Sequence, residues 1–444
     1  MSELKSGAIN IHEIPKSQKG FHDVELDYDA IQNRYAIAIG KGACVLDKDD
    51  RALISASDLS VTIGNELKTK FVNDPRTERI SKENIVFDPG CTGDINGVFN
   101  LFRGIQVKPV KGDCSKILQL LLMMCENNQL VFDWVVNWLA YPLQNLGAKM
   151  RSAMVVHGGE GVGKNLFLST LERIYGEYSA IITQTDIESD FNGWASCKLF
   201  VIGNEVVSRQ EMYHKKGVIK NMITEPFWNI NEKNISPRRE ANHANFVFTS
   251  NHLQPVSPDK DDRRYLILWT PPKMEKEFYR GVAKERDNGG VEAFFYYLLN
   301  KDLREFDEYS EPVSTKAKNE LILLSMKSDQ KFITHWLDGD LPVQVMTCLS
   351  DDLYKFYLAW CKRVGEKFTV TLTEFGTRIG KCDDQLMKMN NQRYRVGARE
   401  HKGTFVFHID TSDKPDDITK IDWLTGCRKA FQDDVNDWVD SSDA

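Results

Sequence analysis

The chain has 444 residues, of which 41% are apolar, so its length permits roughly two to four domains with substantial hydrophobic cores. No apolar run is long enough to span a bilayer, and the first residues lack a signal-peptide pattern, so we expect a cytoplasmic protein with no membrane partner. The nine cysteines form no C-x-x-C pair, which excludes cysteine-based zinc modules and favours reduced thiols.

The formal net charge of −7 is unevenly distributed along the chain. Residues 410–444 hold ten Asp against four Lys or Arg, a net charge of −6, which leaves about −1 for residues 1–409. Acidity of the whole chain therefore does not exclude nucleic acid as a ligand, because basic groups can gather on one surface. We interpret residues 410–444 as an acidic C-terminal tail that folds in part around Trp423, Phe431 and Trp438.

Residues 1–22 are predicted to be a flexible leader, and residues 23–112 an N-terminal α+β domain. Asn33–Leu46 contains two β-runs around Gly40-Lys41-Gly42, which indicates a hairpin. Ser57–Phe71 has a mixed or helical pattern.

Residues 113–150 are predicted to be a helical collar, because apolar residues recur at helical spacing from Ile117 to Cys125 and from Leu130 to Leu139. Pro142 is expected to close the second helix. Apolar stripes of this kind more often form core or subunit contacts than a ligand site.

A glycine-rich loop follows the apolar run Met154–Val156 and precedes a segment with helical periodicity. Gly158, Gly163 and Lys164 satisfy G-x-x-x-x-G-K in a strand–loop–helix context, which is the context of a phosphate-binding P-loop. Glycines let backbone amides face a polyphosphate, the helix N-terminus adds positive potential, and the lysine reaches the terminal phosphates. The predicted ATP-binding residues are Gly158, Gly159, Glu160, Gly161, Val162, Gly163, Lys164 and Asn165.

Two further segments supply candidate catalytic groups. Asn165 stands where Ser or Thr usually holds Mg²⁺, and a carboxamide oxygen can also bind a hard cation. The buried run Leu199–Ile202 ends in Gly203-Asn204-Glu205, without the usual first acid. We predict that Glu205 activates the attacking water and that Mg²⁺ contacts Asn165, Asn204 and Glu205, although a strand-terminal surface glutamate is the simpler alternative.

Two later β-runs are also flanked by polar or charged residues. Asn245–Thr249 leads to Asn251, which can hold the lytic water or sense the γ-phosphate. Arg263 and Arg264 precede the run Tyr265–Trp269, and arginines in such a place can act across a subunit boundary. The predicted catalytic residues are Lys164, Glu205, Asn251, Arg263 and Arg264.

Basic residues are concentrated between the Glu205 and Asn251 segments. A predicted helix, Gly217–Thr224, is followed by a predicted strand, Phe227–Asn231, and by a predicted loop, Asn234–His243. Their cations suit sugar-phosphate contacts and show no base-reading pattern, although a solvated surface loop is the alternative. The predicted DNA-binding residues are Lys220, Lys233, Arg238, Arg239 and His243.

The spacing of these groups, 41 residues from Lys164 to Glu205, 46 more to Asn251 and 13 more to Arg264, resembles that of superfamily 3 helicases. The resemblance covers about residues 110–310 and is strongest to the helicase portion of phage and plasmid primase-helicases, some of which have GKN in place of GKS or GKT. It implies an α/β fold with an AAA+-like P-loop NTPase core over residues 151–310.

The same resemblance implies a function. The expected protein is a hexameric, ATP- and Mg²⁺-dependent DNA helicase or translocase that moves 3′ to 5′ on single-stranded or forked DNA. Its expected setting is replication of a phage or mobile element in the cytoplasm of a bacterial host, with a primase or another replication protein as a further partner. Two alternatives stay open: an ATP-switched origin-binding or loading protein with little hydrolysis, and a non-enzymatic replication scaffold with a vestigial ATP site.

Residues 311–409 are predicted to be a winged-helix-like domain. Two helices over 274–285 and 291–300, divided by Gly289-Gly290, precede a domain boundary near Pro312. Asp351–Val364 and Thr373–Gly380 then have helical patterns. A hairpin from Arg393–Val396 to Thr404–Phe407 is expected around Arg399, His401 and Lys402. This pattern suits DNA docking and protein binding about equally well.

Overall fold

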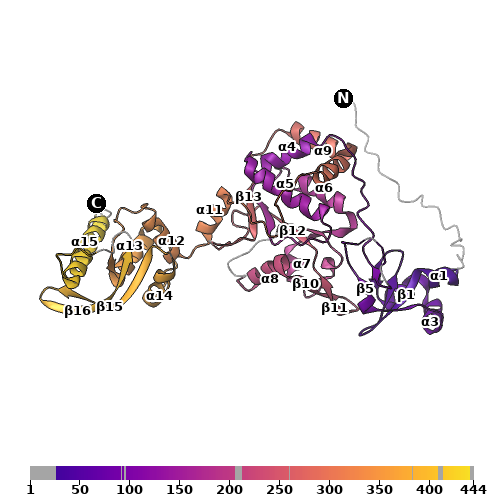
Figure 1. Cartoon of the computed structure of the whole chain (residues 1–444), viewed down its shortest axis with the longest axis horizontal. Coiled ribbons are helices and arrows are strands. Elements are labelled where there is room, and N and C mark those ends of the chain that lie inside the picture. Colours follow the sequence, from indigo (N-terminus) through magenta and orange to yellow (C-terminus); the bar gives the residue numbers. More distant parts are fainter. Residues whose placement is uncertain are drawn as a thin grey trace, which may run out of the picture.

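The computed structural model describes residues 27–91, 93–94, 97–205, 213–259, 261–382, 384–408 and 414–440. The predicted leader lies outside the described residues. Figure 1 shows a central body built on a parallel sheet, with a smaller N-terminal part on one side and a C-terminal part on the other. The described helices include none that is long and apolar enough to cross a membrane.

The N-terminal part is a four-stranded sheet of order β3-β2-β1-β4 with helices beside it. Its elements are α1 (Tyr28–Arg34), β1 (Tyr35–Ile39), β2 (Cys44–Asp47), β3 (Ala52–Ile54), α2 (Ala56–Ile63), α3 (Asn65–Asn73) and β4 (Arg79–Ser81). The predicted hairpin is confirmed, because β1 and β2 pair antiparallel around Gly40–Gly42. The connection to the central body contains η1 (Lys82–Asn84) and a short parallel pair, β5 (Ile85–Val86) and β6 (Phe99–Asn100).

The two predicted collar helices are confirmed as α4 (Ser115–Met124) and α5 (Gln129–Gln144). The prediction that Pro142 closes the second helix is wrong, since Pro142 lies inside α5. Proline removes only its own backbone donor, and the helix is still capped beyond it by the hydrogen bond from Asn145 N to Tyr141 O, 2.8 Å.

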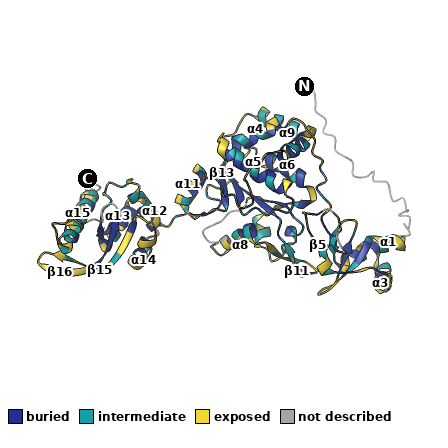
Figure 2. Ribbon diagram, in the orientation of Figure 1, coloured by how far each residue is buried: buried dark blue, intermediate teal, exposed yellow. Residues whose placement is uncertain are grey.

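The central body contains a five-stranded sheet of order β13-β7-β12-β9-β8, in which every pair of neighbours is parallel. The strands are β7 (Ala153–His157), β8 (Ser179–Ile182), β9 (Phe200–Gly203), β12 (Asn245–Ser250) and β13 (Tyr265–Trp269). Figure 2 shows the sheet interior as buried, which explains why these strands are continuous apolar runs instead of alternating ones. The α/β class predicted from the sequence is confirmed.

Helices cover both faces of this sheet, and a two-stranded hairpin projects from it. The helices are α6 (Lys164–Tyr175), η2 (Gly176–Tyr178), α7 (Gln184–Glu188), η3 (Gly193–Ala195), α8 (Tyr213–Thr224), α9 (Lys276–Glu285), the π-helical turn η5 (Arg286–Gly290), α10 (Val291–Leu299) and α11 (Lys316–Ser325). The hairpin strands are β10 (Phe227–Glu232) and β11 (Ile235–Ala241). The predicted division between α9 and α10 is confirmed.

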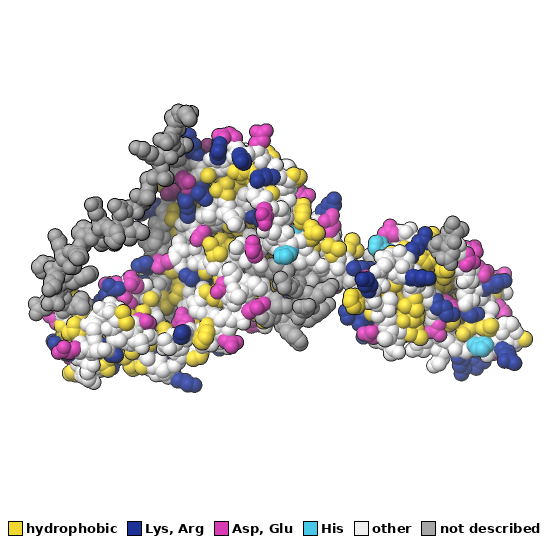
Figure 3. All heavy atoms as spheres, turned by 180° about the vertical axis from the view of Figure 1, so that it is seen from behind, with side chains coloured by type: hydrophobic (Ala, Val, Ile, Leu, Met, Phe, Trp, Pro, Cys, Tyr) yellow, Lys and Arg dark blue, Asp and Glu magenta, His cyan; other side chains and the backbone are white. Residues whose placement is uncertain are grey.

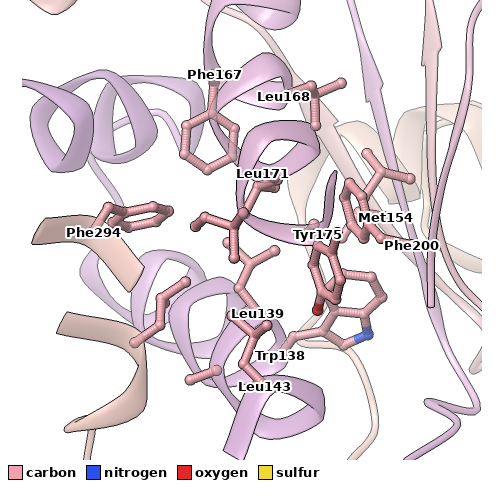
Figure 4. Packing of buried hydrophobic residues seen from close by; sticks show 14 of the residues in the cluster. Trp138, Leu139, Leu143, Met154, Phe167, Leu168, Leu171, Tyr175, Phe200 and Phe294 are labelled. Carbon is pink, nitrogen blue, oxygen red and sulfur yellow. The ribbon is translucent and has the colours of Figure 1, made fainter. Parts of the chain in front are cut away.

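The larger core cluster joins the collar to the sheet. Figure 4 shows Trp138 and Leu139 of α5 beside Leu171 of α6, with Phe294 of α10 on the other side. Trp138 is fully buried, and truncating such a residue to alanine typically costs about 3–5 kcal/mol. This cluster holds α6, and therefore the loop that precedes it, in a fixed place on the sheet.

The second cluster covers the opposite face of the sheet and includes Ile223 of α8 and Leu321 of α11. Helix α11 is tied to β13 by the hydrogen bond from Thr315 Oγ1 to Ile267 O, 2.6 Å. The chain therefore stays on the central body beyond the boundary expected near Pro312 and leaves it after α11.

The C-terminal part has its own core and a three-stranded sheet of order β14-β16-β15. Its elements are α12 (Ser328–Leu337), β14 (Cys348–Leu349), α13 (Ser350–Val364), α14 (Leu372–Cys382), β15 (Leu386–Val396), β16 (Arg399–His408) and α15 (Lys420–Asp440). Within the predicted acidic tail, residues Lys420–Asp440 form α15, whose Phe431 is fully buried against this core. The expected hairpin is present, but its turn is Gly397-Ala398, so Arg399, His401 and Lys402 lie on β16 instead of in the turn.

Candidate functional site

The main candidate site lies at the carboxyl ends of three adjacent strands, β7, β12 and β9. Ser250 is in register with His157, and Phe248 with Gly203, so the segments that follow the three strands converge. They enclose a cavity of about 470 Å³. Its lining residues are Glu160, Gly161, Val162, Gly163, Lys164, Asn165, Leu166, Asn204, Glu205, Thr249, Ser250, Asn251 and Tyr279.

The glycine loop between β7 and α6 needs glycine for two separate reasons. Gly158 and Gly163 have positive φ values of 137° and 91°, which side-chain-bearing residues rarely adopt. A Cβ on Gly163 would also lie 2.9 Å from Leu120 Cδ1, and one on Gly158 would overlap the Thr270 hydroxyl. The path of this loop therefore depends on glycine at both positions. Its backbone amides directly precede the positive N-terminal end of α6, as in anion-binding loops.

Lys164 is the first residue of α6, and its side chain is held inside this loop. Its Nζ donates hydrogen bonds to Gly158 O (2.8 Å), Gly159 O (2.9 Å) and Asn251 Oδ1 (2.7 Å). Burial lowers the pKa of Lys164, and nearby Glu160 and Glu205 act in the opposite direction. All three ammonium hydrogens are used, so an anion that binds Lys164 must replace one of these acceptors.

The residues predicted to contact Mg²⁺ lie around the same cavity. Asn204 Oδ1 accepts a hydrogen bond from Thr249 Oγ1 at 3.1 Å, while Asn165 and Glu205 are exposed. Glu205 has a positive φ of 54°, an uncommon backbone conformation that points to local constraint. The described residues contain no group of three His, Cys, Asp or Glu side chains suited to a metal. The amide, hydroxyl and carboxylate oxygens around this cavity are nevertheless of the kinds that fit Mg²⁺ held jointly with a polyphosphate.

Sequence reasoning missed several lining residues. Tyr279 of α9 lies over the glycine loop, since a Cβ on Gly163 would come within 3.0 Å of its ring, and its hydroxyl accepts from Met274 N at 3.1 Å. Thr249 was the last residue of a predicted strand and Ser250 followed it, but only Asn251 was expected to be functional there. No signal separated Tyr279 from core aromatics, because its place over the loop depends on how α9 packs.

His157 ends β7 immediately before the glycine loop. It is buried, with its ring 4.9 Å from the Trp269 ring and its Nδ1 3.3 Å from His252 O. Its Nε2 has no hydrogen-bond partner among the described residues. Burial lowers the pKa of His157, so the neutral ring is the stable form here.

Arg263 and Arg264 do not meet the other predicted catalytic residues within one chain. Arg264 O accepts a hydrogen bond from Ala153 N (2.7 Å) at the start of β7, whereas the glycine loop follows the end of that strand. A five-residue strand spans roughly 13–17 Å, so the arginines lie at the amino ends of the strands, on the side of the sheet opposite to the glycine loop. They line a separate cavity of about 260 Å³. The Arg263 side chain is 78% exposed, and its Nη1 lies 3.6 Å from Glu311 Oε1.

The prediction of a loop from Asn234 to His243 is wrong, because residues Ile235–Ala241 form strand β11 and the turn is limited to Lys233-Asn234. The pairing with β10 explains this: a two-residue turn with Asn234 at φ 65° suits a tight hairpin. Of the predicted DNA-binding residues, Lys233, Arg238 and Arg239 are therefore presented by a β-ribbon, whereas Lys220 lies on α8 and His243 follows β11.

Three of the five predicted DNA-binding residues are engaged within the chain. Lys220 Nζ lies 3.0 Å from an Asp259 oxygen and 3.5 Å from an Asp262 oxygen. His243 Nδ1 lies 2.6 Å from Gly147 O. Arg238 is paired with Glu232 (2.6 Å) and Glu240 (3.4 Å).

The other two, Lys233 and Arg239, are exposed on the hairpin. A second exposed basic region lies on the C-terminal hairpin, β15–β16. Figure 3 shows Lys and Arg side chains gathered at the outer end of the C-terminal part. The exposed basic residues of that hairpin are Lys388, Arg393, Arg395, Arg399, His401 and Lys402.

Comparison with known proteins finds one family model that matches the central part of the chain. A model of a family of unknown function, DUF5906, matches residues 156–264, the stretch that holds the glycine loop, Glu205, the hairpin and Asn251. No curated protein matches the sequence.

Solved structures resemble most of the chain. An apo structure of the C-terminal region of NrS-1 (residues 305–718) matches with a TM-score of 0.58 and 21% identity, covering 82% of this chain and 86% of that chain. An A-form apo structure of the same region gives the same values, and another A-form structure has a TM-score of 0.56 and 20% identity. At this level of identity the likeness establishes a shared fold.

Proposed function

We propose that this protein is an ATP-dependent DNA helicase or translocase whose AAA+-like core works in a ring, as the resemblance to superfamily 3 helicases implies. One observation carries the proposal: Lys164 lies inside a glycine loop, bonded to Asn251, in a cavity that Glu205 also lines. The strand that leads to Asn251 lies between the strands that lead to the glycine loop and to Glu205. This order lets all three groups address one phosphate.

The chain's own residues have distinct roles in this proposal. Loop amides and Lys164 hold the phosphates of ATP, Asn251 positions the attacking water, and Glu205 accepts its proton. Mg²⁺, held with help from Asn165, Asn204 and Glu205, would neutralise charge on the phosphate oxygens. Lys164 would exchange its bond to Asn251 for one to a phosphate, which frees the Asn251 carboxamide for the water.

The position of the two arginines supports a ring. Arg263 and Arg264 lie at the amino ends of the strands, whereas the glycine loop lies at the carboxyl ends. They can therefore contact a bound phosphate only at the site of another subunit. A head-to-tail arrangement of subunits meets this requirement, and closure of such an arrangement produces a ring, for which the resemblance implies six subunits. The β10–β11 hairpin would then contact single-stranded DNA through Lys233 and Arg239.

ATPase assays with and without single-stranded DNA test the proposal. Lys164→Ala should lose nucleotide binding, and Glu205→Gln should bind ATP but turn it over at least about 100-fold more slowly. Matched controls are Lys316→Ala and Glu277→Gln, since those side chains are 82% and 80% exposed and neither residue lines the cavity. Normal DNA-stimulated turnover in both Lys164→Ala and Glu205→Gln would refute the proposal.

One observation favours a second candidate, an ATP-switched loading protein with little hydrolysis. Asn204 occupies the place of the usual first acid and its oxygen is engaged by the Thr249 hydroxyl, which leaves Glu205 as the only carboxylate at the end of β9 among the described residues. This candidate predicts tight ATP binding and ATP-dependent assembly with no turnover above that of Glu205→Gln, with or without DNA.

A further inference from the structure

The β10–β11 hairpin has two different faces, and its register defines them. Asn229 pairs with Arg239, and Phe227 with Ala241, so these residues share what we call the outer face. Two other cross-strand pairs, Ile230 with Arg238 and Trp228 with Glu240, form the inner face, and a register shift separates them from the last pair, Glu232 with Ile235, beside the turn.

The inner face is fully engaged within the chain. Ile230 is fully buried, and the Trp228 ring lies 5.8 Å from the Trp194 ring in an edge-to-face contact. Arg238 donates to Glu232 Oε2 (2.6 Å) and to Ser196 Oγ (2.7 Å). On the same strand, Ser236 lies so close to the N-terminal part that a Cβ on Gly42 would overlap its hydroxyl.

The outer face presents a different surface. Phe227 is 49% exposed, although aromatic side chains are usually buried, and the Arg239 guanidinium lies over its ring at 3.8 Å from the centroid. Because the two residues are diagonal neighbours on a paired ribbon, the ring is held in place by the strand register and by the cation. The outer-face residues are Phe227, Asn229, Arg239 and Ala241, which include one cation and no carboxylate.

We propose that Phe227 and Arg239 form a stacking platform for a base of single-stranded nucleic acid, with Phe227 contacting the base and Arg239 the adjacent phosphate. An oriented aromatic ring beside a cation suits a strand of bases and phosphates, since every base has a π-face and every linkage a negative charge. Lys233, exposed at the turn, extends the positive charge along the ribbon. The platform rests on the proposed function and assigns to Phe227 a role that phosphate contacts alone would not require.

Binding of fluorescent oligo-dT to the full chain, in the presence of a non-hydrolysable ATP analogue, tests the platform. Phe227→Ala should weaken binding by roughly 10-fold or more, the effect of losing one base stack, while Phe227→Trp should retain it. A strand of abasic linkages should bind Phe227→Ala and wild type equally, because it offers no base. Arg239→Ala should instead lower the salt dependence of binding by about one phosphate contact, both for oligo-dT and for the abasic oligonucleotide. Phe368→Ala is the matched control, since that phenylalanine is 84% exposed in the C-terminal part.

The outcomes separate the platform from the proposed function. If wild type binds oligo-dT and Phe227→Ala binds within twofold of the Phe368→Ala control, the platform is refuted while the motor proposal stands. Equal loss on oligo-dT and abasic strands would also refute stacking. Loss of self-association in Phe227→Ala with nucleic-acid affinity intact would show that the face binds another subunit. A wild type that binds no single strand would overturn both proposals, and unchanged unfolding temperatures would show that the variants fold.

Discussion

The hydrogen bond from Lys164 Nζ to Asn251 Oδ1, 2.7 Å, links the phosphate-binding and water-positioning groups of the proposed mechanism. Asn251→Ala removes this acceptor and leaves Lys164 bonded to Gly158 O and Gly159 O. Hydrogen bonds to charged groups contribute roughly 1.5–3 kcal/mol when buried. Because Asn251 is exposed and water can replace it, we expect a loss nearer to about 1 kcal/mol in the nucleotide-free protein.

The same substitution should affect binding and turnover differently. ATP affinity should stay within threefold of wild type, because Lys164 no longer has to give up Asn251 when it binds a phosphate. Turnover should fall roughly 100-fold, equivalent to about 2.7 kcal/mol of transition-state stabilisation, because the water loses the group that positions it.

Equilibrium binding of a fluorescent ATP analogue and single-turnover hydrolysis measure the two effects separately. His252→Ala is the neighbouring control, since the structure uses the His252 backbone carbonyl, 3.3 Å from His157 Nδ1, and leaves the residue exposed. Wild-type turnover in Asn251→Ala would refute its role with water. A loss of affinity above tenfold at normal turnover would show that Asn251 binds nucleotide instead.

Three further predictions concern the same region. Gly163→Ala should lower the free energy of unfolding by roughly 2–4 kcal/mol and abolish nucleotide binding, because φ is 91° and the new Cβ would clash with Leu120. The control Gly365→Ala, at φ 74° in open space, should lower it by only about 1–2 kcal/mol, as measured by thermal unfolding. Mixing inactive Lys164→Ala with an inactive Arg263→Ala/Arg264→Ala variant should restore part of the ATPase activity, since mixed neighbours form some complete sites; no recovery would contradict action between subunits. Burial lowers the pKa of His157, so its contribution to stability is present above the unfolded-state pKa near 6.5 and is lost as pH falls below it. The unfolding temperature should therefore drop more between pH 7 and pH 5.5 in wild type than in His157→Gln.

Local patterns in the sequence predicted most of the individual elements. Tyr265–Trp269 was predicted as a strand with the bounds that β13 has, and Met154–Val156 lies within β7. These elements follow from short-range properties: apolar runs that suit buried parallel strands, helical periodicity, and glycines at positive φ. The same properties place Lys164, Asn204 and Asn251 at strand or helix ends, so their convergence in one cavity could be expected once a parallel sheet was assumed.

The identity of the exposed arginine on the hairpin depended on tertiary structure. Arg238 and Arg239 are adjacent and chemically identical, and the sequence treats them alike. Strand register sends Arg238 to the inner face, where Glu232 and Glu240 neutralise it, and Arg239 to the outer face, over Phe227. A residue in a loop has no such alternation, so predicting a loop here removed the information that separates the two.

Long-range packing decided the remaining features. Arg264 lies at the amino end of the sheet, away from the glycine loop, because β13 runs parallel to β7. Tyr279 reaches the glycine loop because α9 packs beside α6. Partial folding of the acidic tail around Phe431 was expected from the sequence, but only the packing of α15 shows that Phe431 is buried in the C-terminal core. By itself, the sequence determined most of the strand and helix segments and the position of the glycine loop, since these depend on neighbours along the chain; β11 was an exception. The tertiary structure alone decided which charged groups remain exposed for a ligand, because burial and ion pairing depend on residues distant in the sequence.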